Sequence, residues 1–295
     1  MVLSLVDCTI AVVGASGNTG ALLVERLVRG GAKVIAISRT PDRLARLADP
    51  NVEIRPVDAG GDAALLRAAV IDASVVINVA HARYTRALIG ALAGPDVRLI
   101  TLGSTRIFTR FPDTKAAEVS DAEAAHAGVV NGVILHSTMI YGGADNNIRR
   151  IIRFVRRIPV VPLPQGGRAL LQPIHRDDVV ECLIAAINKD VGREPVIIAG
   201  AEALPYSDII RACGRAIGKN VWIVSLPLWA MLALAKLTRY LPGIPAIETD
   251  EVRRLCEDKA FDISAMQERL GVTPCNFTQG LTRSPAKNGQ ICASA

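Results

Sequence analysis

The stretch IAVVGASGNTG, residues 10–20, decides the fold of this chain. Its three glycines, Gly14, Gly17 and Gly20, directly follow the apolar run Thr9–Val13, which is typical of a buried strand. Glycine permits a tight turn after the strand, lets a phosphate approach the backbone, and lets the next helix pack closely on the strand. Because the free N–H groups at a helix start attract anions, we predict a strand, a phosphate-binding loop and a helix in that order.

Short polar side chains complete this loop. Ser16, Asn18 and Thr19 are suited to bond phosphate oxygens or to cap the helix. Since strand, loop and helix stand in the expected order, we interpret the stretch as a dinucleotide-binding site, with an ordinary glycine-rich turn as the alternative.

From residue 9 to about 136, short β-branched runs alternate with Ala- and Leu-rich stretches. We predict strands at Thr9–Val13, Lys33–Ser38, Val52–Val57, Val75–Val79, Arg98–Gly103 and Gly132–His136, and helices at about 18–29, 41–48, 62–70, 83–93 and 114–127. The strands are nearly continuous apolar runs, so both faces of the sheet should be covered. This pattern predicts an α/β fold with a doubly wound parallel sheet, the Rossmann architecture.

The composition changes after Tyr141. A basic amphipathic helix at about 147–157 precedes the segment VPLPQGG at 161–167, and a strand at Ala169–Ile174, a helix at His175–Asn188 and a strand at Pro195–Ala199 that rejoins the sheet are expected next. Residues 205–283 are predicted to be mostly helical. We therefore expect a dinucleotide-binding domain of residues 1–140 plus about 175–200, a smaller C-terminal substrate lobe of residues 141–174 plus 201–283, and a mobile polar tail, 284–295.

The chain has 295 residues, half of them hydrophobic, which is enough to bury a large core. Its net charge of +6 is locally concentrated, because five arginines lie between residues 149 and 157. For this reason nucleic acid is not inferred as a partner.

Six scattered cysteines form no CxxC pair and have no histidine at metal-ligand spacing, so neither a disulfide framework nor a metal site is predicted. No signal peptide is evident, and we expect a cytoplasmic protein. The apolar segment Leu226–Leu241 is interrupted by Pro227, Lys236 and Arg239 and is too short to span a bilayer. We predict that it is a buried or lid helix, with contact at a membrane interface as the alternative.

Further motifs follow the predicted strands in order. They are Asp58 after the third strand, NVA at 78–80 after the fourth, GS at 103–104 after the fifth, TMIYGG at 138–143 after the sixth, and QPIHRDDVV at 172–180. Together with GASGNTG at 14–20, they resemble the extended and atypical branches of the short-chain dehydrogenase/reductase superfamily, which also contain NAD-dependent epimerases and dehydratases. The resemblance covers about residues 9–200 and implies an NAD(P)-binding Rossmann fold.

The end of the second predicted strand indicates the type of cofactor. Ser38, Arg39 and Thr40 stand where a carboxylate would favour NAD, and a guanidinium beside hydroxyls suits the 2′-phosphate of NADP. NADP(H) is therefore preferred over NAD(H), with Arg39 as a solvated residue at the helix start as the alternative. The resemblance implies that Asp58 accepts from the adenine amine, although it could instead cap its loop. The predicted cofactor-binding residues are Gly14, Ser16, Gly17, Asn18, Thr19, Gly20, Arg39, Asp58, Asn78, Val79 and Ala80.

The catalytic pattern of this superfamily is absent. A tyrosine followed four residues later by lysine normally moves the proton, but none of the four tyrosines has that lysine. Two registers place the degenerate site: Phe111 to Lys115, which keeps the lysine, or Ala117 to Asp121, which aligns better with the downstream helix. The sequence does not choose between them.

Ser104, Lys115 and Tyr141 are the candidate catalytic residues. The resemblance implies that Ser104 orients a substrate carbonyl, while Tyr141 follows the sixth strand and could reach the nicotinamide or be structural. His81 and Tyr84 follow the fourth strand near the cofactor and are further candidate acids.

The arginine-rich helix has two interpretations. In nucleotide-sugar enzymes the corresponding region holds a diphosphate, for which Asn146, Asn147 and Arg153 would be the matching residues. Alternatively it is a solvated amphipathic helix.

These observations favour an NADP(H)-dependent oxidoreductase that transfers hydride between nicotinamide and a carbonyl, imine or activated alkene. Its expected substrate is a small molecule, with apolar molecules among the candidates. The alternatives are a non-catalytic NAD(P)-binding regulatory or assembly protein and a nucleotide-sugar epimerase or dehydratase, which the missing Tyr and Lys disfavour. Monomer and homodimer both remain open.

Overall fold

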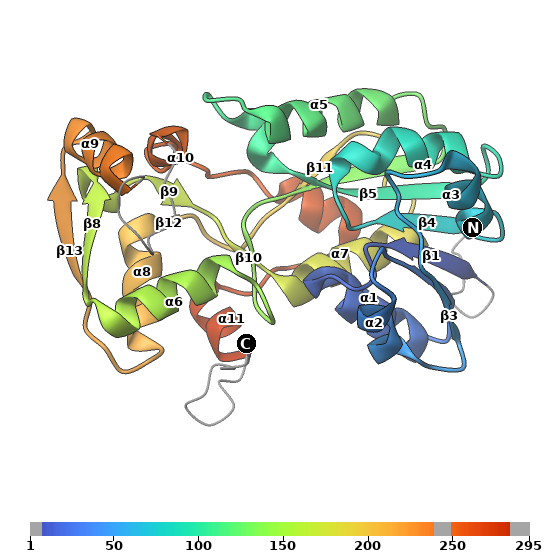
Figure 1. The fold of residues 1–295 in the computed structure, drawn as a ribbon, viewed down its shortest axis with the longest axis horizontal. Helices are drawn as coiled ribbons and strands as arrows, with labels where there is room; N and C mark the ends of the chain where they lie inside the picture. Colours follow the sequence, from blue (N-terminus) through green and yellow to red (C-terminus); the bar gives the residue numbers. More distant parts are fainter. Residues whose placement is uncertain (1–7, 239–248, 284–295) are drawn as a thin grey trace.

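The computed structural model describes residues 8–238 and 249–283. Within them, a seven-stranded parallel sheet has the strand order β11-β6-β5-β4-β1-β2-β3 (Figure 1). Its strands are β1 (Thr9–Val13), β2 (Lys33–Ile37), β3 (Val52–Arg55), β4 (Val75–Asn78), β5 (Arg98–Ser104), β6 (Gly132–Ser137) and β11 (Val196–Ile198). The predicted α/β fold with a doubly wound parallel sheet is confirmed.

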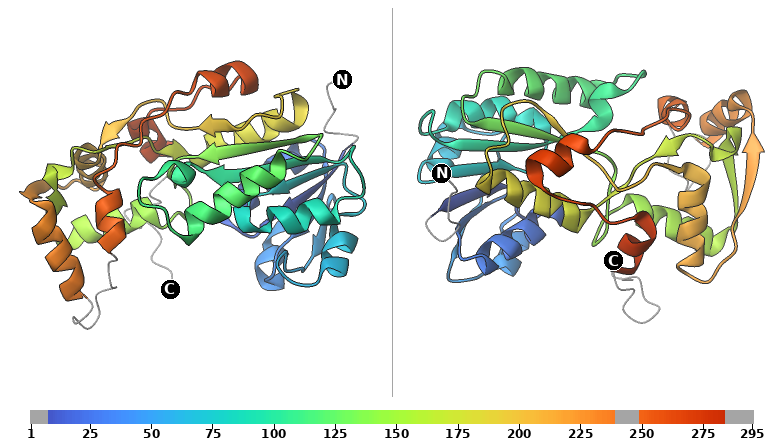
Figure 2. Two further views of the ribbon diagram at one scale, coloured as in Figure 1. Left: turned by 90° about the horizontal axis from the view of Figure 1, so that it is seen from above. Right: turned by 180° about the vertical axis from the view of Figure 1, so that it is seen from behind.

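Helices cover both faces of this sheet (Figures 1 and 2). Helices α1 (Asn18–Arg29) and α7 (Arg176–Asn188) cover one face, and α3 (Ala63–Val70), α4 (Thr85–Ala91) and α5 (Thr114–His126) cover the other. The short helix α2 (Pro41–Leu44) and the 3-10 helix η2 (Ala45–Leu47) follow β2.

Strand β1 is apolar without alternation because it is buried on both faces of the sheet. Ile10 and Val12 pack in the cluster under α1 and α7, whereas Ala11 and Val13 pack in the cluster under α3 and α4. Side chains on a strand alternate between faces, and here both faces are covered, so every position must be apolar. Strand β11 pairs in parallel with β6, which confirms the prediction that a strand near 195–199 rejoins the sheet.

The second lobe lies beyond the carboxyl ends of the sheet strands (Figure 1). Its elements are β7 (Ile140–Tyr141), α6 (Asn147–Arg157), β8 (Val160–Pro164), η5 (Gln165–Gly167), β9 (Leu170–Leu171), β10 (Ile174–His175), β12 (Leu204–Pro205), α8 (Tyr206–Arg215), β13 (Trp222–Leu226), α9 (Leu228–Thr238), α10 (Thr249–Arg254), the π-helix η6 (Met266–Leu270) and α11 (Phe277–Arg283). The exception is η6, which lies with the sheet: Met266 and Leu270 pack in the core cluster under α1 and α7.

The expectation that residues 205–283 are mostly helical was wrong for β13. This strand pairs in parallel with β8, which includes part of the proline-rich segment 161–167. Prolines lower the strand signal because they cannot donate to a ladder. In a two-stranded sheet each strand leaves one edge unpaired, so Pro162 and Pro164 are accommodated there.

Among the described residues, no helix has both the length and the apolar character needed to cross a bilayer. The predicted buried or lid helix corresponds to α9, where Ala235 is buried and Trp229 is exposed. Residues 239–241 of that apolar segment and the tail 284–295 lie outside the described residues.

Candidate functional site

The glycine loop is held by close backbone contacts at the end of β1. Gly14 has φ +89°, and a Cβ atom there would lie 2.7 Å from the backbone nitrogen of Ala80. A Cβ atom at Gly20 would overlap the carbonyl oxygen of Gly14. The backbone nitrogens of Gly14 and Ala15 both donate to the Ile37 carbonyl at the end of β2. These contacts bring the ends of β1, β2 and β4 together around one turn.

Helix α1 begins directly at this turn. Gly17 is its N-cap and contributes no side-chain cap, so the first backbone N–H groups of α1 keep their capacity to bind an anion. A Cβ atom at Gly17 would meet only the Gly14 carbonyl oxygen, at 3.2 Å. Thr19 is half-buried in the first turn of the helix.

A groove of ≈ 340 Å³ lies against this loop. Its lining residues are Val13, Gly14, Ser16, Gly17, Ile37, Ser38, Arg39, Val57, Asp58, Ala59, Val79, Ala80, His81, Arg83 and Tyr84. They come from the carboxyl ends of β1, β2, β3 and β4, where ligands bind in doubly wound folds.

The wall of the groove after β2 is polar and carries a positive charge. The hydroxyl oxygens of Ser16 and Ser38 are 2.6 Å apart, which links the glycine loop to the end of β2. Arg39 is exposed beside them. Among the described residues that line the groove, Asp58 is the one carboxylate, and it follows β3 rather than β2.

The wall after β3 and β4 is shaped by side chains that bond to the backbone. Asp58 Oδ1 accepts from the Gly60 nitrogen at 3.0 Å, so Asp58 caps its loop while also lining the groove. Asn78 is buried; its amide donates to the His81 carbonyl and accepts from the Ala80 nitrogen. Asn78 therefore shapes the turn that places Val79 and Ala80 along the groove.

The two registers proposed for the degenerate catalytic pair lie differently in the structure. Phe111 precedes the N-cap Asp113, so Phe111 and Lys115 do not share a helical turn. Ala117 and Asp121 both lie on α5, but Asp121 is bound to Arg86 of α4. The α5 residue that meets the groove wall is Glu118.

Glu118 lies against His81, one of the residues that line the groove. His81 Nδ1 is 3.4 Å from Glu118 Oε2, and the two side chains are 34% and 24% exposed. Nδ1 also accepts from the Arg83 nitrogen at 3.3 Å. Burial lowers the pKa of His81, the negative charge of Glu118 raises it, and the positive charges of Arg83 and Lys115 lower it. The pair therefore combines a neutral imidazole with a carboxylate that can stabilise its protonated form.

Glu118 was not predicted from the sequence, although His81 was noted. The signal was weak, because the pair joins the turn after β4 to α5 and the two residues are far apart in the chain. Glu118 does stand three residues after Lys115, a spacing that puts both on one side of a helix.

The three candidate catalytic residues have different environments. Ser104 ends β5 and its hydroxyl oxygen accepts from the Arg106 nitrogen at 3.2 Å. Lys115 is exposed in the first turn of α5 and is near enough to His81 to lower the pKa of its imidazole.

Tyr141 is fully buried at the junction of the two lobes. Its hydroxyl donates to the Phe277 carbonyl at 3.3 Å, and its ring lies 5.1 Å from that of His175 and 4.9 Å from that of Phe277. Burial raises the pKa of the phenol. Tyr141 is not among the groove-lining residues, and these contacts favour a structural role.

Asn18 connects the start of α1 with the second lobe. Its amide nitrogen donates to the Gly142 carbonyl at 2.9 Å, and its Oδ1 accepts from the Ala144 nitrogen at 2.8 Å and from Arg176 Nη1 at 3.0 Å. The side chain of Asn18 is therefore engaged in joining the lobes, which leaves its backbone N–H at the helix start.

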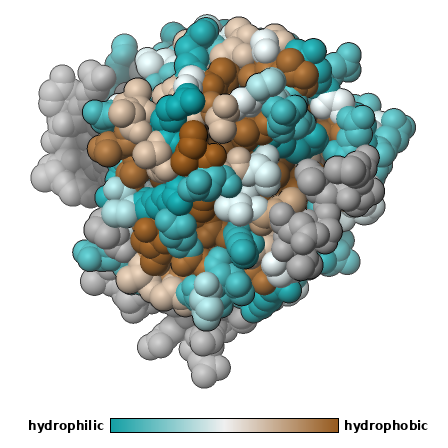
Figure 3. All heavy atoms as spheres, turned by 90° about the vertical axis from the view of Figure 1, so that its right-hand side faces the viewer, coloured by the Kyte–Doolittle hydropathy of each residue, from teal (hydrophilic) through white to brown (hydrophobic). Residues whose placement is uncertain are grey.

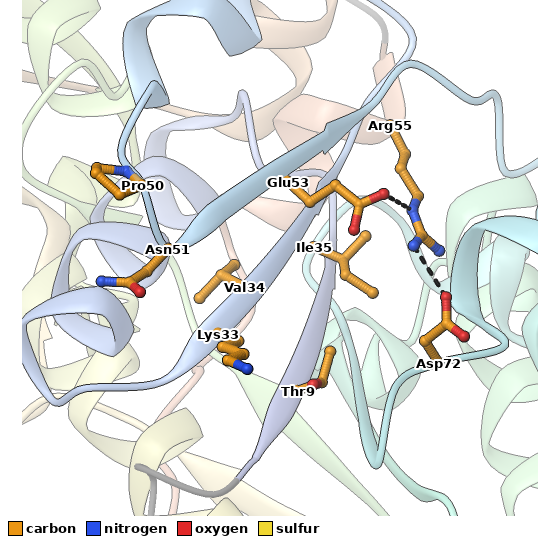
Figure 4. A pocket seen from close by; sticks show the side chains of 9 residues that line it. All are labelled: Thr9, Lys33, Val34, Ile35, Pro50, Asn51, Glu53, Arg55 and Asp72. Carbon is orange, nitrogen blue, oxygen red and sulfur yellow. Dashed lines mark hydrogen bonds and ion pairs between the residues drawn. The ribbon is translucent and has the colours of Figure 1, made fainter.

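A second hollow of ≈ 350 Å³ lies at the opposite edge of the sheet, where β1 and β2 begin at Thr9 and Lys33. Arg55 in its wall is paired with Glu53 and Asp72 (Figure 4). The described residues that line this hollow include no glycine and no helix start, so the hollow lacks the features that bind a dinucleotide.

Comparisons with known proteins agree with this geometry. Residues 14–154 match the NAD(P)H-binding family. An uncharacterized protein of Mycobacterium tuberculosis is 26% identical over 219 residues, which are 70% of this chain and 23% of that protein. Subunit 9 of the NADH dehydrogenase [ubiquinone] 1 alpha subcomplex, mitochondrial, of Arabidopsis thaliana is 24% identical over 200 residues, or 61% of this chain and 50% of the subunit.

Among solved structures, UDP-glucuronic acid 4-epimerase from Bacillus cereus, in complex with UDP-glucuronic acid and NAD, has a similar fold. It is 17% identical with a TM-score of 0.70, over 94% of this chain and 97% of the epimerase. The chain itself spans 23% of the mycobacterial relative and 50% of the plant relative.

Residues 14–154 therefore form an NAD(P)H-binding Rossmann domain, and the fold of the chain is similar to that of the Bacillus cereus epimerase. The groove fits such a cofactor, because a side chain at Gly14 or Gly20 would not fit and one at Gly17 would enter the space beside the helix start.

Replacing Gly17 with valine should weaken NADPH binding by at least about tenfold, which is about 1.4 kcal/mol, because the side chain would occupy the space over the start of α1. The measurement is a calorimetric titration of the purified chain with NADPH. Gly90→Ala is the matched control, since a Cβ atom there meets nothing within 4 Å. Unchanged affinity of the Gly17→Val variant would contradict the assignment of the pyrophosphate to this loop.

Proposed function

We propose that this protein is an NADP(H)-dependent oxidoreductase acting on a small molecule. The observation that carries the cofactor preference is the wall after β2, where Arg39 lies beside the hydroxyls of Ser16 and Ser38 and no carboxylate from the segment after β2 lines the groove. A guanidinium presents a planar set of donors to phosphate oxygens, whereas a carboxylate would repel them. Arg39 would hold the 2′-phosphate, and the backbone around Gly14 and Gly17 would hold the pyrophosphate.

The bound cofactor would supply or accept the hydride. The chain must then position the substrate and move a proton. His81 is the group best suited to the proton, because it lines the groove and Glu118 can stabilise its protonated imidazolium. No described residue makes a hydrogen bond to its Nε2 atom, which leaves that nitrogen able to act on a substrate.

Ser104 and Lys115 would assist at the same end of the sheet. The Ser104 oxygen accepts a backbone hydrogen bond, so its own proton can be donated to a substrate oxygen. The positive charge of Lys115 would favour negative charge developing on that oxygen.

Aromatic rings beside this end of the sheet support an apolar substrate. Phe108, in the 3-10 helix η4 (Thr105–Phe108) that follows Ser104, is 53% exposed. Its ring lies 5.9 Å from that of Phe261 and 6.1 Å from that of His136. Ligand pockets are lined mainly by apolar and aromatic side chains with a few polar groups, so these rings favour a mostly apolar substrate at this end of the sheet.

A second candidate is a protein that binds NAD(P)H without turnover. The burial of Tyr141 and the absence of a tyrosine–lysine pair on α5 favour it, and one relative is a subunit of an NADH dehydrogenase. The name of the Bacillus cereus structure suggests a nucleotide-sugar epimerase, but reversible oxidation of a sugar hydroxyl needs the strong base that α5 lacks.

Arg39→Ala should weaken NADPH binding by at least about tenfold and leave NADH binding within about threefold, because the guanidinium meets only the 2′-phosphate. Fluorescence titrations with both cofactors measure this. Arg43→Ala removes an exposed arginine of the adjacent helix that does not line the groove, and it should change neither affinity. Equal losses for NADPH and NADH in the Arg39 variant would reject the NADP preference.

A panel of aldehydes, ketones, imines and enones then separates the two candidates. Oxidation of NADPH with any of them supports the enzyme, and tight binding with no turnover across the panel supports the second candidate.

With a substrate from that panel, His81→Gln should lower kcat by about 100-fold or more while NADPH affinity stays the same. Reduction requires protonated His81, so activity should fall as the pH rises through the pKa of His81. Glu118→Gln removes the charge that raises this pKa, and the fall should therefore begin at lower pH.

The matched control is Asp121→Asn on the same helix, whose carboxylate binds Arg86 instead of the groove wall. An NMR titration of the His81 ring gives its pKa independently of turnover. If Glu118→Gln shifts neither this titration nor the pH profile, the proposed coupling is wrong.

A further inference from the structure

Two sequence ranges of the second lobe are free of acidic residues. Residues 146–176 and 209–247 contain no Asp or Glu. They do contain basic residues throughout, namely Arg149, Arg150, Arg153, Arg156, Arg157, Arg168, Arg176, Arg211, Arg215, Lys219, Lys236 and Arg239. The elements in these ranges include α6, β8, β13 and α9, which stand together at the end farthest from the sheet (Figure 1).

The small β8–β13 sheet at this end has one covered face and one open face. Val161 and Ile223 pair in register and pack with Val155 of α6 and Ile210 of α8. Neighbouring side chains on a strand point to the opposite face, so Val160 and Trp222, which also pair in register, share the open face.

Large apolar side chains continue along this open face. Trp222 is 71% exposed, and Val160 and Val224 are exposed beside it. Ile158, in extended backbone before β8, is exposed in line with Val160, and Trp229 at the start of α9 is 74% exposed. We call the set Ile158, Val160, Trp222, Val224 and Trp229 the distal apolar patch. It holds both tryptophans of the chain.

Basic groups border the distal apolar patch. Arg156 and Arg157 end α6 directly before Ile158, and both are exposed. Lys219 reaches the same corner, since its Nζ donates to the Arg156 carbonyl at 2.6 Å. The opposite end of the molecule lacks this segregation: its hydrophilic and hydrophobic residues are interspersed (Figure 3).

We propose that the distal apolar patch docks the protein on the surface of an anionic lipid bilayer. Surfaces that combine exposed tryptophans with Arg and Lys bind at the headgroup region of a bilayer. There the indole rings enter the interface and the cations contact lipid phosphates. The exposed Arg156, Arg157 and Lys219 beside the distal apolar patch complement the negative surface of such a bilayer. The residues that line the cofactor groove come from the nucleotide-binding domain, and none of them belongs to the distal apolar patch.

The full chain is tested by co-sedimentation with vesicles of phosphatidylcholine alone and of phosphatidylcholine mixed with phosphatidylglycerol. It should bind the anionic vesicles at least about tenfold more tightly, and salt should weaken the binding. Because both tryptophans lie in the patch, their fluorescence should shift to shorter wavelength on binding, and lipids brominated in the acyl chains should quench it.

Two sets of variants separate the apolar and the charged contributions. Trp222→Ser with Trp229→Ser, and Arg156→Gln with Arg157→Gln, should each lower vesicle affinity by about tenfold or more. The matched controls, Leu65→Ser and Arg43→Gln with Arg46→Gln, change exposed residues of the nucleotide-binding domain and should bind vesicles like the unaltered chain. NADPH affinity and circular dichroism check that every variant is folded.

Three results would overturn the proposal. The first is no binding to anionic vesicles, and the second is binding that persists in both pairs of patch variants. The third is a dimer that sedimentation velocity detects in the unaltered chain but not in the tryptophan variants, together with no binding of the chain to vesicles. The patch would then join two copies of this chain.

Discussion

The close approach of the turn at Gly14 to the backbone of Ala80 is the constraint on which the rest of the site depends. No side chain fits between them. Helix α1 packs directly on the same turn at Gly20, where a Cβ atom would overlap the Gly14 carbonyl oxygen. Because the turn is this tight, the ends of β1, β2 and β4 stand side by side and the start of α1 faces the space between them. Val79, Ala80 and His81 then follow β4 along the same groove.

The fold could be predicted from the sequence because two strong local signals agree with the global structure. The strands of the sheet are buried on both faces and are apolar throughout, and the glycine spacing marks the first crossover. The β8–β13 sheet was missed because its prolines weaken the strand signal, and such a small sheet depends on packing against α6 and α8 that no local pattern reports.

The candidate site was predicted in part, for a similar reason. Groove residues that follow strands could be placed from their order, since the carboxyl ends of parallel strands share one edge. The pairing of His81 with Glu118, the bonds from Asn18 to the second lobe and the burial of Tyr141 depend on contacts between distant segments. The sequence predicted that the Asn18 side chain bonds a phosphate or caps the helix, whereas its bonds to Gly142, Ala144 and Arg176 across the lobe junction could not be predicted from local sequence.

The central claim is that the groove at the carboxyl edge of the sheet holds NADP(H), with its pyrophosphate over the start of α1. A crystal structure of the chain with NADP⁺ tests this most directly. Pyrophosphate density is expected against the backbone of Gly14 to Gly17, and 2′-phosphate density is expected beside Arg39. Nucleotide density at another place, such as the hollow lined by Lys33 and Arg55, would contradict it.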